Sequence, residues 1–172
     1  MNLIKKSSQG FTLVELLIVV IILAVLAAIV FPQFSASTND AKAAALQSNL
    51  TNIRSAIEFY YQEHGEYPGA NIATGATCAS GGAGTAAASG AAGSEDALIA
   101  QLTRYTNDDG LACTGKGATF KYGPYIKGDI PVNPEGTSNT VTVVSAGVLG
   151  LSSSATGGWR YDTVTGEFIS DQ

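Results

Sequence analysis

The sequence predicts an α+β fold, in which one long N-terminal helix packs against a small antiparallel β-sheet. Two patterns along the chain support this prediction. Apolar residues first form an unbroken run from Leu16 to Phe31 and then recur every three or four positions as far as His64, which is typical of a continuous helix. After residue 120, short stretches rich in aromatic and β-branched residues alternate with turn residues, which is typical of strands.

The first element is an apolar segment at residues 11–34, preceded by a short basic stretch at residues 1–10. The run from Phe11 to Phe31 has 21 residues, or about 31 Å as a helix, which matches the ~30 Å hydrocarbon core of a bilayer. Lys5 and Lys6 precede the run. By the positive-inside rule they place the N-terminus in the cytoplasm and the rest of the chain outside, so we expect a single-pass membrane helix.

Glu15 is the one charged residue inside this apolar run. A charged side chain at the bilayer centre costs roughly 2.5–3.5 kcal/mol, so a carboxylate here needs a partner or a function. A secretory signal peptide cleaved near Ala36-Ser37 is one interpretation, but Glu15 argues against it because a charge at the front of the apolar region weakens insertion. A plain membrane anchor is a second interpretation.

A third interpretation comes from a resemblance to a known family. The segment Gly10-Phe11-Thr12-Leu13-Val14-Glu15-Leu16 resembles the cleavage and methylation motif of type IV prepilins and type II secretion pseudopilins. The resemblance implies that a prepilin peptidase cuts between Gly10 and Phe11 and methylates the new N-terminus. Residues 1–10 would then be a cleaved leader.

The same resemblance provides a partner for Glu15. Cleavage creates an ammonium at Phe11, and the ammonium of a neighbouring subunit can pair with Glu15 inside an apolar bundle of helices. A subunit out of register would leave a buried carboxylate unpaired, which costs several kcal/mol. We therefore expect Glu15 to set the axial register of a homopolymer and to favour assembly over staying in lipid.

Pro32 follows the apolar run. Because a proline removes one helical hydrogen bond and clashes with the preceding turn, we expect a kink near residues 28–32. The helix is expected to continue over residues 35–65 as an amphipathic, soluble half. The apolar stripe consists of Ala36, Ala43, Leu46, Leu50, Ile53, Ile57 and Tyr60. Gly65 is the predicted C-cap, and His64 is expected to contribute a helix-end charge.

Residues 66–172 are expected to form a globular head. It opens with Glu66-Tyr67-Pro68, which resembles the exit from the long helix in pilin-like proteins, and residues 69–94 form an irregular loop rich in small residues. The only cysteines, Cys78 and Cys113, predict one disulfide in an oxidising compartment, with two unrelated buried thiols as the alternative. Such a disulfide would stabilise the head by roughly 3–4 kcal/mol.

The rest of the head alternates turns and short elements. Ser94 is the predicted N-cap of a short helix that carries Leu98, Leu102 and Tyr105 on one face, and residues 107–110 form a turn. Strands are expected at residues 120–125, 140–144, 159–161 and 167–169, with a hairpin loop at residues 162–166.

Further stretches of the head resemble the same family. Gly123-Pro124-Tyr125-Ile126 and Ile130-Pro131-Val132-Asn133-Pro134 resemble the segment before the sheet in major pseudopilins and related pilins, and residues 159–166 resemble their closing hairpin. Glu135-Gly136 stands where major pseudopilins usually have a tryptophan-glycine step. The first resemblance favours a pseudopilin, whereas the missing tryptophan and the long small-residue loop favour a pilus subunit.

Composition and motifs argue against several other classes of protein. A net charge of −5 provides no basic footprint for nucleic acid. No nucleophile motif or phosphate-binding loop is present, so we expect no enzyme activity. Asp108 and Asp109 are weak candidates for calcium ligands, because adjacent acids in such a turn are usually only solvated; otherwise no cofactor is expected.

The expected function is that of a structural subunit of a type IV pilin-like filament, either in a pilus or as the major pseudopilin of a type II protein secretion system. The resemblance implies an inner-membrane assembly platform, an ATPase and minor pilins as partners, and membrane lipid before assembly. The expected location is the bacterial inner membrane with the head in the periplasm, and then the pilus or pseudopilus. The alternative is a membrane-anchored binding protein whose head recognises a ligand.

Overall fold

The structure is a computed structural model that describes residues 10–71 and 90–172, with only the backbone described at residues 31–36. Contacts between residues divide the chain into two compact units, Met1–Ala41 and Lys42–Gln172. The first unit contains the apolar part of the long helix. The second unit contains the rest of that helix and the head.

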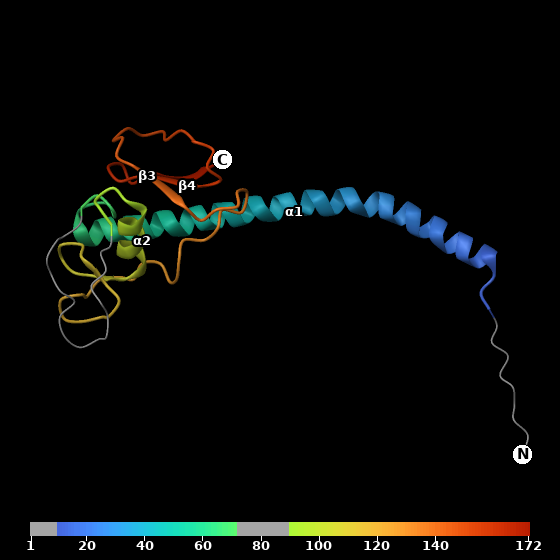
Figure 1. The fold of residues 1–172 in the computed structure, drawn as a ribbon, viewed down its shortest axis with the longest axis horizontal. Coiled ribbons are helices and arrows are strands. Elements are labelled where there is room, and N and C mark those ends of the chain that lie inside the picture. The colour runs from blue at the N-terminus through green and yellow to red at the C-terminus, as the bar shows by residue number, and fades with distance from the viewer. Residues whose placement is uncertain (1–9, 72–89) are drawn as a thin grey trace, which may run out of the picture. The chain divides into compact units, whose positions relative to one another are not determined.

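The long helix α1 (Leu13–His64) has 52 residues and is labelled in Figure 1. It ends where Gly65 adopts a left-handed φ of 73° and its N–H donates to the carbonyl of Tyr61 at 2.8 Å. This confirms the predicted glycine C-cap, because a residue with a Cβ is strained in that conformation. The helix also continues through Pro32 as expected, while a kink there stays a prediction.

Six shorter elements follow. They are α2 (Glu95–Thr103), β1 (Tyr105–Thr106), β2 (Ala112–Cys113), β3 (Val141–Val144), β4 (Gly158–Asp162) and β5 (Phe168–Asp171). The predicted N-cap of α2 is confirmed, since Ser94 Oγ accepts the N–H of Ala97 at 3.3 Å. Tyr105 was wrongly placed on this helix, because the chain leaves it at Arg104, whose backbone is extended.

The predicted strand at residues 120–125 is wrong. Only Tyr122 pairs there, in an isolated bridge with Thr106, and Pro124 has no N–H with which to continue a ladder. The turn at residues 107–110 is confirmed and joins the antiparallel strands β1 and β2. In this turn Asn107 Oδ1 accepts the N–H groups of Asp109 at 3.2 Å and Leu111 at 2.7 Å.

The main sheet of the head has three strands in the order β3-β4-β5. Strands β4 and β5 are antiparallel, as predicted, and Gly166 with φ 72° lies in the hairpin loop between them. Strands β3 and β4 are parallel, so the wholly antiparallel sheet was wrong in this detail. The reason is the connection at residues 145–157, which returns the chain to the end of the sheet where β3 begins. Strand β4 therefore runs in the same direction as β3. The α+β class itself is confirmed.

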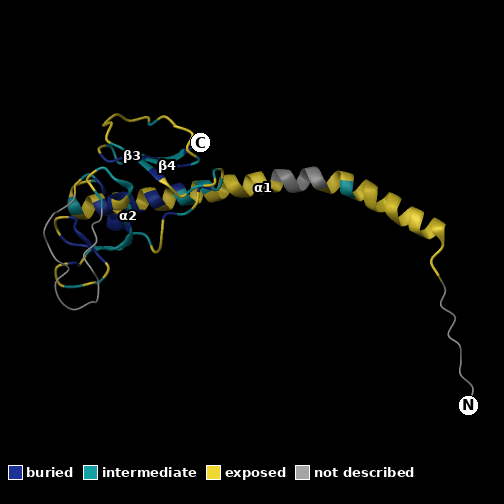
Figure 2. Ribbon diagram, in the orientation of Figure 1, coloured by how far each residue is buried: buried dark blue, intermediate teal, exposed yellow. Residues whose placement is uncertain are grey.

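One hydrophobic core joins the second half of α1, helix α2 and the sheet (Figure 2). The sheet contributes Trp159, Tyr161 and Phe168, each 0 % exposed, and α1 contributes chiefly Ile53 and Ile57. Of the predicted stripe, Leu50, Ile53, Ile57 and Tyr60 are buried and Leu46 packs against them, whereas Ala43 is exposed. Ala56 is a further buried position on the same face of α1, which the predicted stripe omitted.

Candidate assembly site at the start of α1

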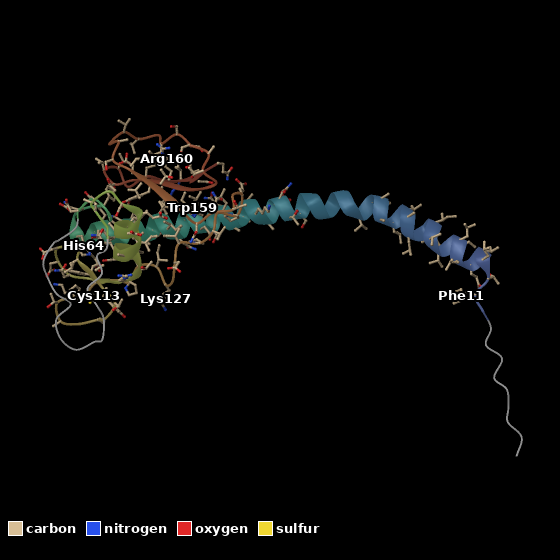
Figure 3. The ribbon with its side chains drawn as sticks, viewed as in Figure 1. Phe11, His64, Cys113, Lys127, Trp159 and Arg160 are labelled. Atoms are coloured by element: carbon tan, nitrogen blue, oxygen red, sulfur yellow. The ribbon has the colours of Figure 1, made fainter. Side chains whose placement is uncertain are left out.

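The predicted processing residues, Gly10 and Phe11, lie just before α1 and outside regular secondary structure. Both are exposed, and the Phe11 side chain is 83 % exposed at the N-terminal end of the helix (Figure 3). Apart from its chain neighbours, no described atom lies within 4 Å of the position that a Cβ would take on Gly10. The backbone between these residues is therefore accessible to a peptidase.

Thr12 and Glu15 form a capping box at the first turn of α1. The N–H of Glu15 donates to Thr12 Oγ1 at 3.2 Å. In return, the N–H and the hydroxyl of Thr12 donate to Glu15 Oε2 at 2.9 and 2.8 Å. The sequence-based prediction named Glu15 and missed this role of Thr12, although the T-x-x-E spacing that signals a capping box was present in the sequence.

The capping box occupies only one oxygen of the Glu15 carboxylate. Within the described part of the chain, Glu15 Oε1 accepts no hydrogen bond, and the residue is exposed. The macrodipole of α1 favours a negative charge at this end of the helix. The site therefore presents a carboxylate that is held in place on one side and able to accept a further donor on the other.

An apolar surface follows the Thr12–Glu15 capping box along α1, and no described part of the chain covers it. The stretch Leu13–Val30 is long and apolar enough to cross a membrane, and none of it is buried. Exposed fractions of its large side chains range from 44 % at Val30 to 81 % at Leu13. Leaving such surface in water costs about 25 cal/mol per Å², so this stretch requires lipid or other helices around it.

The predicted disulfide is only partly within the described residues. Cys113 lies in β2 and is 3 % exposed. Cys78 lies outside the described residues, and so does the side chain of Pro32. The pairing of Cys78 with Cys113 therefore stays a prediction.

The two weak calcium candidates have partners within the head. Asp108 Oδ1 lies 2.9 Å from Lys121 Nζ and accepts the Tyr122 hydroxyl at 2.9 Å. Hydrogen bonds from Lys121 and Tyr122 hold the pKa of Asp108 below its usual value. Asp109 Oδ2 accepts from Asn107 Nδ2 at 3.2 Å. Among the described residues, no three His, Cys, Asp or Glu side chains are grouped to hold a metal ion.

His64 differs from its expected role as a helix-end charge. Its Nε2 lies 2.9 Å from Thr106 Oγ1 and 3.2 Å from the Tyr125 hydroxyl. Burial lowers the pKa of His64 below its usual 6.5, although the nearby Asp108 and Glu63 oppose the shift. The ring is therefore mostly neutral at pH 7 and links the end of α1 to the head through hydrogen bonds.

Comparison with known proteins bears on this N-terminal site. The family described as the prokaryotic N-terminal methylation motif matches residues 5–31. The chain carries this methylation motif. The matched stretch includes Gly10, Phe11, the Thr12–Glu15 capping box and the whole apolar stretch Leu13–Val30.

Individual relatives are type IV pilins, fimbrial proteins and a type II secretion protein. The chain is 38 % identical over 80 residues to a fimbrial protein of Neisseria meningitidis, covering 46 % of this chain and 45 % of that protein. It is 34 % identical over 64 residues to type II secretion system core protein G of Pseudomonas aeruginosa, covering 37 % of this chain and 45 % of that protein. A type IV major pilin protein of Neisseria gonorrhoeae is 36 % identical over 75 residues, or 44 % of each chain.

The chain thus spans about half the length of the curated relatives it matches. No solved structure matches the chain significantly.

Proposed function

We propose that this chain is the structural subunit of a type IV pilin-like filament, made as a membrane-held precursor and polymerised through α1. One observation carries the proposal: the methylation motif at residues 5–31 coincides with an apolar helical surface that no described part of the chain covers. Relatives named as fimbrial proteins, type IV major pilins and secretion protein G support it.

Processing would occur between Gly10 and Phe11. A prepilin peptidase removes residues 1–10 and methylates the amino group of Phe11. The exposure of both residues and the open space around Gly10 support this step. The new N-terminus then stands one residue before the Thr12 cap, so α1 keeps its first turn after cleavage.

Glu15 would act in assembly as an acceptor for the Phe11 ammonium of a neighbouring subunit. Its Oε2 is bound to Thr12 of the same chain, which fixes the carboxylate, and Oε1 faces away from these bonds as the acceptor for the neighbour. Inside a bundle of apolar helices an unpaired carboxylate costs several kcal/mol. Only subunits in the correct axial register avoid that cost.

Before assembly, α1 would anchor the precursor in the bacterial inner membrane with the head in the periplasm, as Lys5 and Lys6 favour. An assembly platform, its ATPase and minor pilins are the proposed partners at this stage. The head would be stabilised in this oxidising compartment by the Cys78–Cys113 disulfide.

The proposal covers two kinds of filament. The fimbrial relatives support a pilus on the cell surface, and the relative in a type II secretion system supports a short pseudopilus. Immuno-electron microscopy of intact cells separates the two, because only a surface pilus is labelled outside the cell without permeabilisation.

Mass spectrometry of the mature chain tests the processing step. We expect an N-methylated Phe11 at the N-terminus, and in a Gly10→Val variant we expect the uncut precursor to accumulate. A matched Gln9→Val variant should be processed normally. A mature N-terminus at any other residue contradicts the proposal.

The Glu15→Ala variant tests assembly. We expect the chain to insert in the membrane and to be cut after Gly10 but to form few filaments. If this variant assembles as well as the natural chain, Glu15 does not set the register.

A polar cleft in the head favours a second candidate function, that of a membrane-anchored binding protein. The cleft has a volume of about 400 Å³ and lies among Tyr60, His64 and Asp108. The Glu15→Ala variant distinguishes the two functions, since a tethered binding protein keeps its function when filaments are lost.

A further inference from the structure

The polar cleft in the head lies where the end of α1 meets the turn between β1 and β2. Its volume of about 400 Å³ is within the range of cavities that hold small organic ligands, roughly 300–1,000 Å³. The end of α1 and the residues after it contribute Tyr60, His64, Glu66, Tyr67 and Asn71. The turn contributes Asp108, Asp109 and Gly110. All of these residues belong to the unit Lys42–Gln172, so no second copy of the chain is needed to form the cleft.

Three carboxylates line the cleft, and two of them have no ion pair in the described part of the chain. Asp108 pairs with Lys121 at 2.9 Å, whereas Glu66 and Asp109 form no ion pair with a described residue. His64 is the one basic side chain among the described lining residues, and burial lowers its pKa so that it is mostly neutral at pH 7. The cleft therefore carries two uncompensated negative charges, which favour a cationic ligand.

Neighbouring amides hold these two carboxylates by one oxygen each. Asn71 Nδ2 donates to Glu66 Oε2 at 2.5 Å, and Asn107 Nδ2 donates to Asp109 Oδ2 at 3.2 Å. The other oxygens, Glu66 Oε1 and Asp109 Oδ1, accept no hydrogen bond from a described residue. Each carboxylate is thus positioned on one side and has its second oxygen available for a charged donor such as an ammonium.

The hydroxyl of Tyr60 is a second, independent observation that points to a ligand. Tyr60 is 2 % exposed and lines the cleft, yet its hydroxyl forms no hydrogen bond with a described residue. Burial and the nearby Glu66 carboxylate raise the pKa of Tyr60, so the hydroxyl stays protonated. The large majority of buried side-chain polar atoms have a hydrogen-bond partner. An unused hydroxyl at a cleft therefore indicates that its partner comes from outside the chain.

Gly110 keeps the space beside this hydroxyl open. A Cβ on Gly110 would lie 2.6 Å from Tyr60 Oη, which is closer than side-chain atoms pack. The φ of Gly110 is 75°, a conformation that also disfavours any residue with a side chain. The turn is held in this position because Gln101 Nε2 donates to the Gly110 carbonyl at 2.8 Å. The room beside the Tyr60 hydroxyl is therefore built into the fold.

Aromatic rings provide much of the remaining lining. The ring of His64, at the C-terminal end of α1 (Figure 3), lies 4.1 Å from that of Tyr60 between centroids. The ring of Tyr67 stacks on Tyr61 at 4.4 Å, which fixes its position. Aromatic faces attract cations that lie within about 6 Å of the ring centroid. Their apolar surface also covers aliphatic carbon. The lining therefore suits positive groups that are joined by a hydrocarbon chain.

A metal ion fits this lining less well than an organic cation. Among the residues that the structure describes, no three His, Cys, Asp or Glu side chains are grouped to hold a metal ion. Calcium takes 6–8 oxygen ligands, whereas the two unpaired carboxylates come from different segments of the head. Two ammonium groups on one flexible molecule can each meet one of these carboxylates.

We propose that the polar cleft binds a small aliphatic diamine or polyamine. One ammonium group binds Glu66 Oε1 and the hydroxyl oxygen of Tyr60, and a second binds Asp109 Oδ1. The hydrocarbon chain between them lies against the rings of Tyr67 and His64. This site does not depend on filament formation, and it gives the second candidate function a class of ligand.

Isothermal titration calorimetry of the full chain in a nonionic detergent tests the site. The probes are 1,4-diaminobutane and 1-aminobutane, which have the same carbon chain and differ by one ammonium group. At physiological ionic strength we expect the diamine to bind at least tenfold more tightly than the monoamine. A smaller difference, or no binding of the diamine, overturns the proposal.

Variants of the two carboxylates test which residues bind the amine. Glu66→Gln and Asp109→Asn each remove one charge and keep the size of the side chain, and each should weaken binding of the diamine at least tenfold. Asp129→Asn removes the same charge from an exposed loop and should change the affinity less than twofold. Equal losses in all three variants would mean that only the net charge of the chain attracts the amine, which overturns the site.

A Tyr60→Phe variant removes only the hydroxyl. We expect it to weaken binding of the diamine at least threefold. The thermal unfolding midpoint of the ligand-free variant should not fall, because the hydroxyl has no partner among the described residues. A lower midpoint would show that the hydroxyl bonds within the chain, and an unchanged affinity would show that it does not contact the ligand. Either result contradicts the proposal.

The outcomes separate this inference from the proposed function. A natural chain that forms filaments but does not prefer the diamine overturns the amine site alone. A natural chain that binds the diamine but forms no filament overturns the filament proposal alone.

Discussion

The hydroxyl of Thr12 donates to the carboxylate of Glu15 at 2.8 Å, and the N–H of Glu15 donates back to Thr12 Oγ1 at 3.2 Å. The charge in the apolar segment therefore has a partner within its own chain, one turn away. This local pair reduces the number of unsatisfied groups that α1 carries into a membrane. It also orients the carboxylate before any neighbouring subunit arrives.

The first prediction tests this orientation. Thr12→Val keeps the shape of the side chain and removes both hydroxyl bonds, which we expect to cost about 1 kcal/mol at the helix N-terminus. Filament yield should fall, and amide hydrogen exchange in the first turn should quicken, while cleavage after Gly10 continues.

The matched variant for this test is Thr12→Ser, which keeps the hydroxyl. It should assemble like the natural chain. If the valine and serine variants assemble equally well, the capping box does not contribute to assembly.

A second prediction concerns two residues of α1 with opposite surroundings. Ile57 is 0 % exposed in the core, whereas Phe59 is 61 % exposed. Ile57→Ala should lower the free energy of unfolding of the head by about 2–5 kcal/mol, because it leaves a cavity between α1 and the sheet. Phe59→Ala should change it by less than about 0.5 kcal/mol. Thermal unfolding of the two variants checks this. A large loss from Phe59→Ala would mean that this side chain is part of the core.

The long helix was predictable because its signals are local. The spacing of Ile53, Ile57 and Tyr60 identified the buried face, and Gly65 marked the end, since each signal depends only on residues within a few turns. The hairpin that closes the sheet was predictable for the same reason. Gly166 supplies a left-handed residue between two short aromatic strands.

The topology around β3 was not predictable in the same way. Whether Val141 pairs with Trp159 in a parallel or an antiparallel sense depends on the path of residues 145–157, which carry no periodic pattern. That path is fixed by Asp162, Glu167 and Asp171, whose partners lie well over ten residues away. The neutral state of His64 likewise results from tertiary burial, which its place in the helix did not indicate.

A third prediction follows from His64, the only histidine of the chain. Burial lowers its pKa in the folded state below the 6.5 of the unfolded state. Between the folded pKa and pH 6.5, the native state therefore binds fewer protons than the unfolded state. Stability is therefore fully present above pH 6.5 and declines as the pH falls through the folded pKa.

Titration of the His64 ring by NMR measures this directly, and a midpoint at or above 6.5 contradicts the prediction. In His64→Gln the decline of stability between pH 6.5 and the folded pKa should disappear, while the decline at more acidic pH remains.

A fourth prediction concerns Asp171, which is 0 % exposed and accepts hydrogen bonds from the end of the β3–β4 connection. It accepts hydrogen bonds from the Ser153 hydroxyl at 2.8 Å, the Ala155 N–H at 3.0 Å and the Thr156 hydroxyl at 2.6 Å. Ser154 adds its hydroxyl at 2.7 Å and also its N–H. Burial alone would raise the pKa of Asp171, but the hydrogen bonds from Thr156, Ser154 and Ser153 outweigh it and hold the pKa well below 3.8.

Because the folded pKa of Asp171 is the lower one, its stabilisation is fully present above pH 3.8 and is lost as the pH falls through the folded pKa. Asp171→Asn removes the charge that these donors surround and should lower the free energy of unfolding by about 2 kcal/mol at pH 7. The free energy of unfolding of this variant should also fall less on acidification than that of the natural chain. Denaturant titrations between pH 2 and 7 would measure this. Asp129→Asn, on an exposed loop, should keep the natural profile. Equal pH dependence of stability in the Asp171→Asn and Asp129→Asn variants would show that the Asp171 carboxylate does not stabilise the connection.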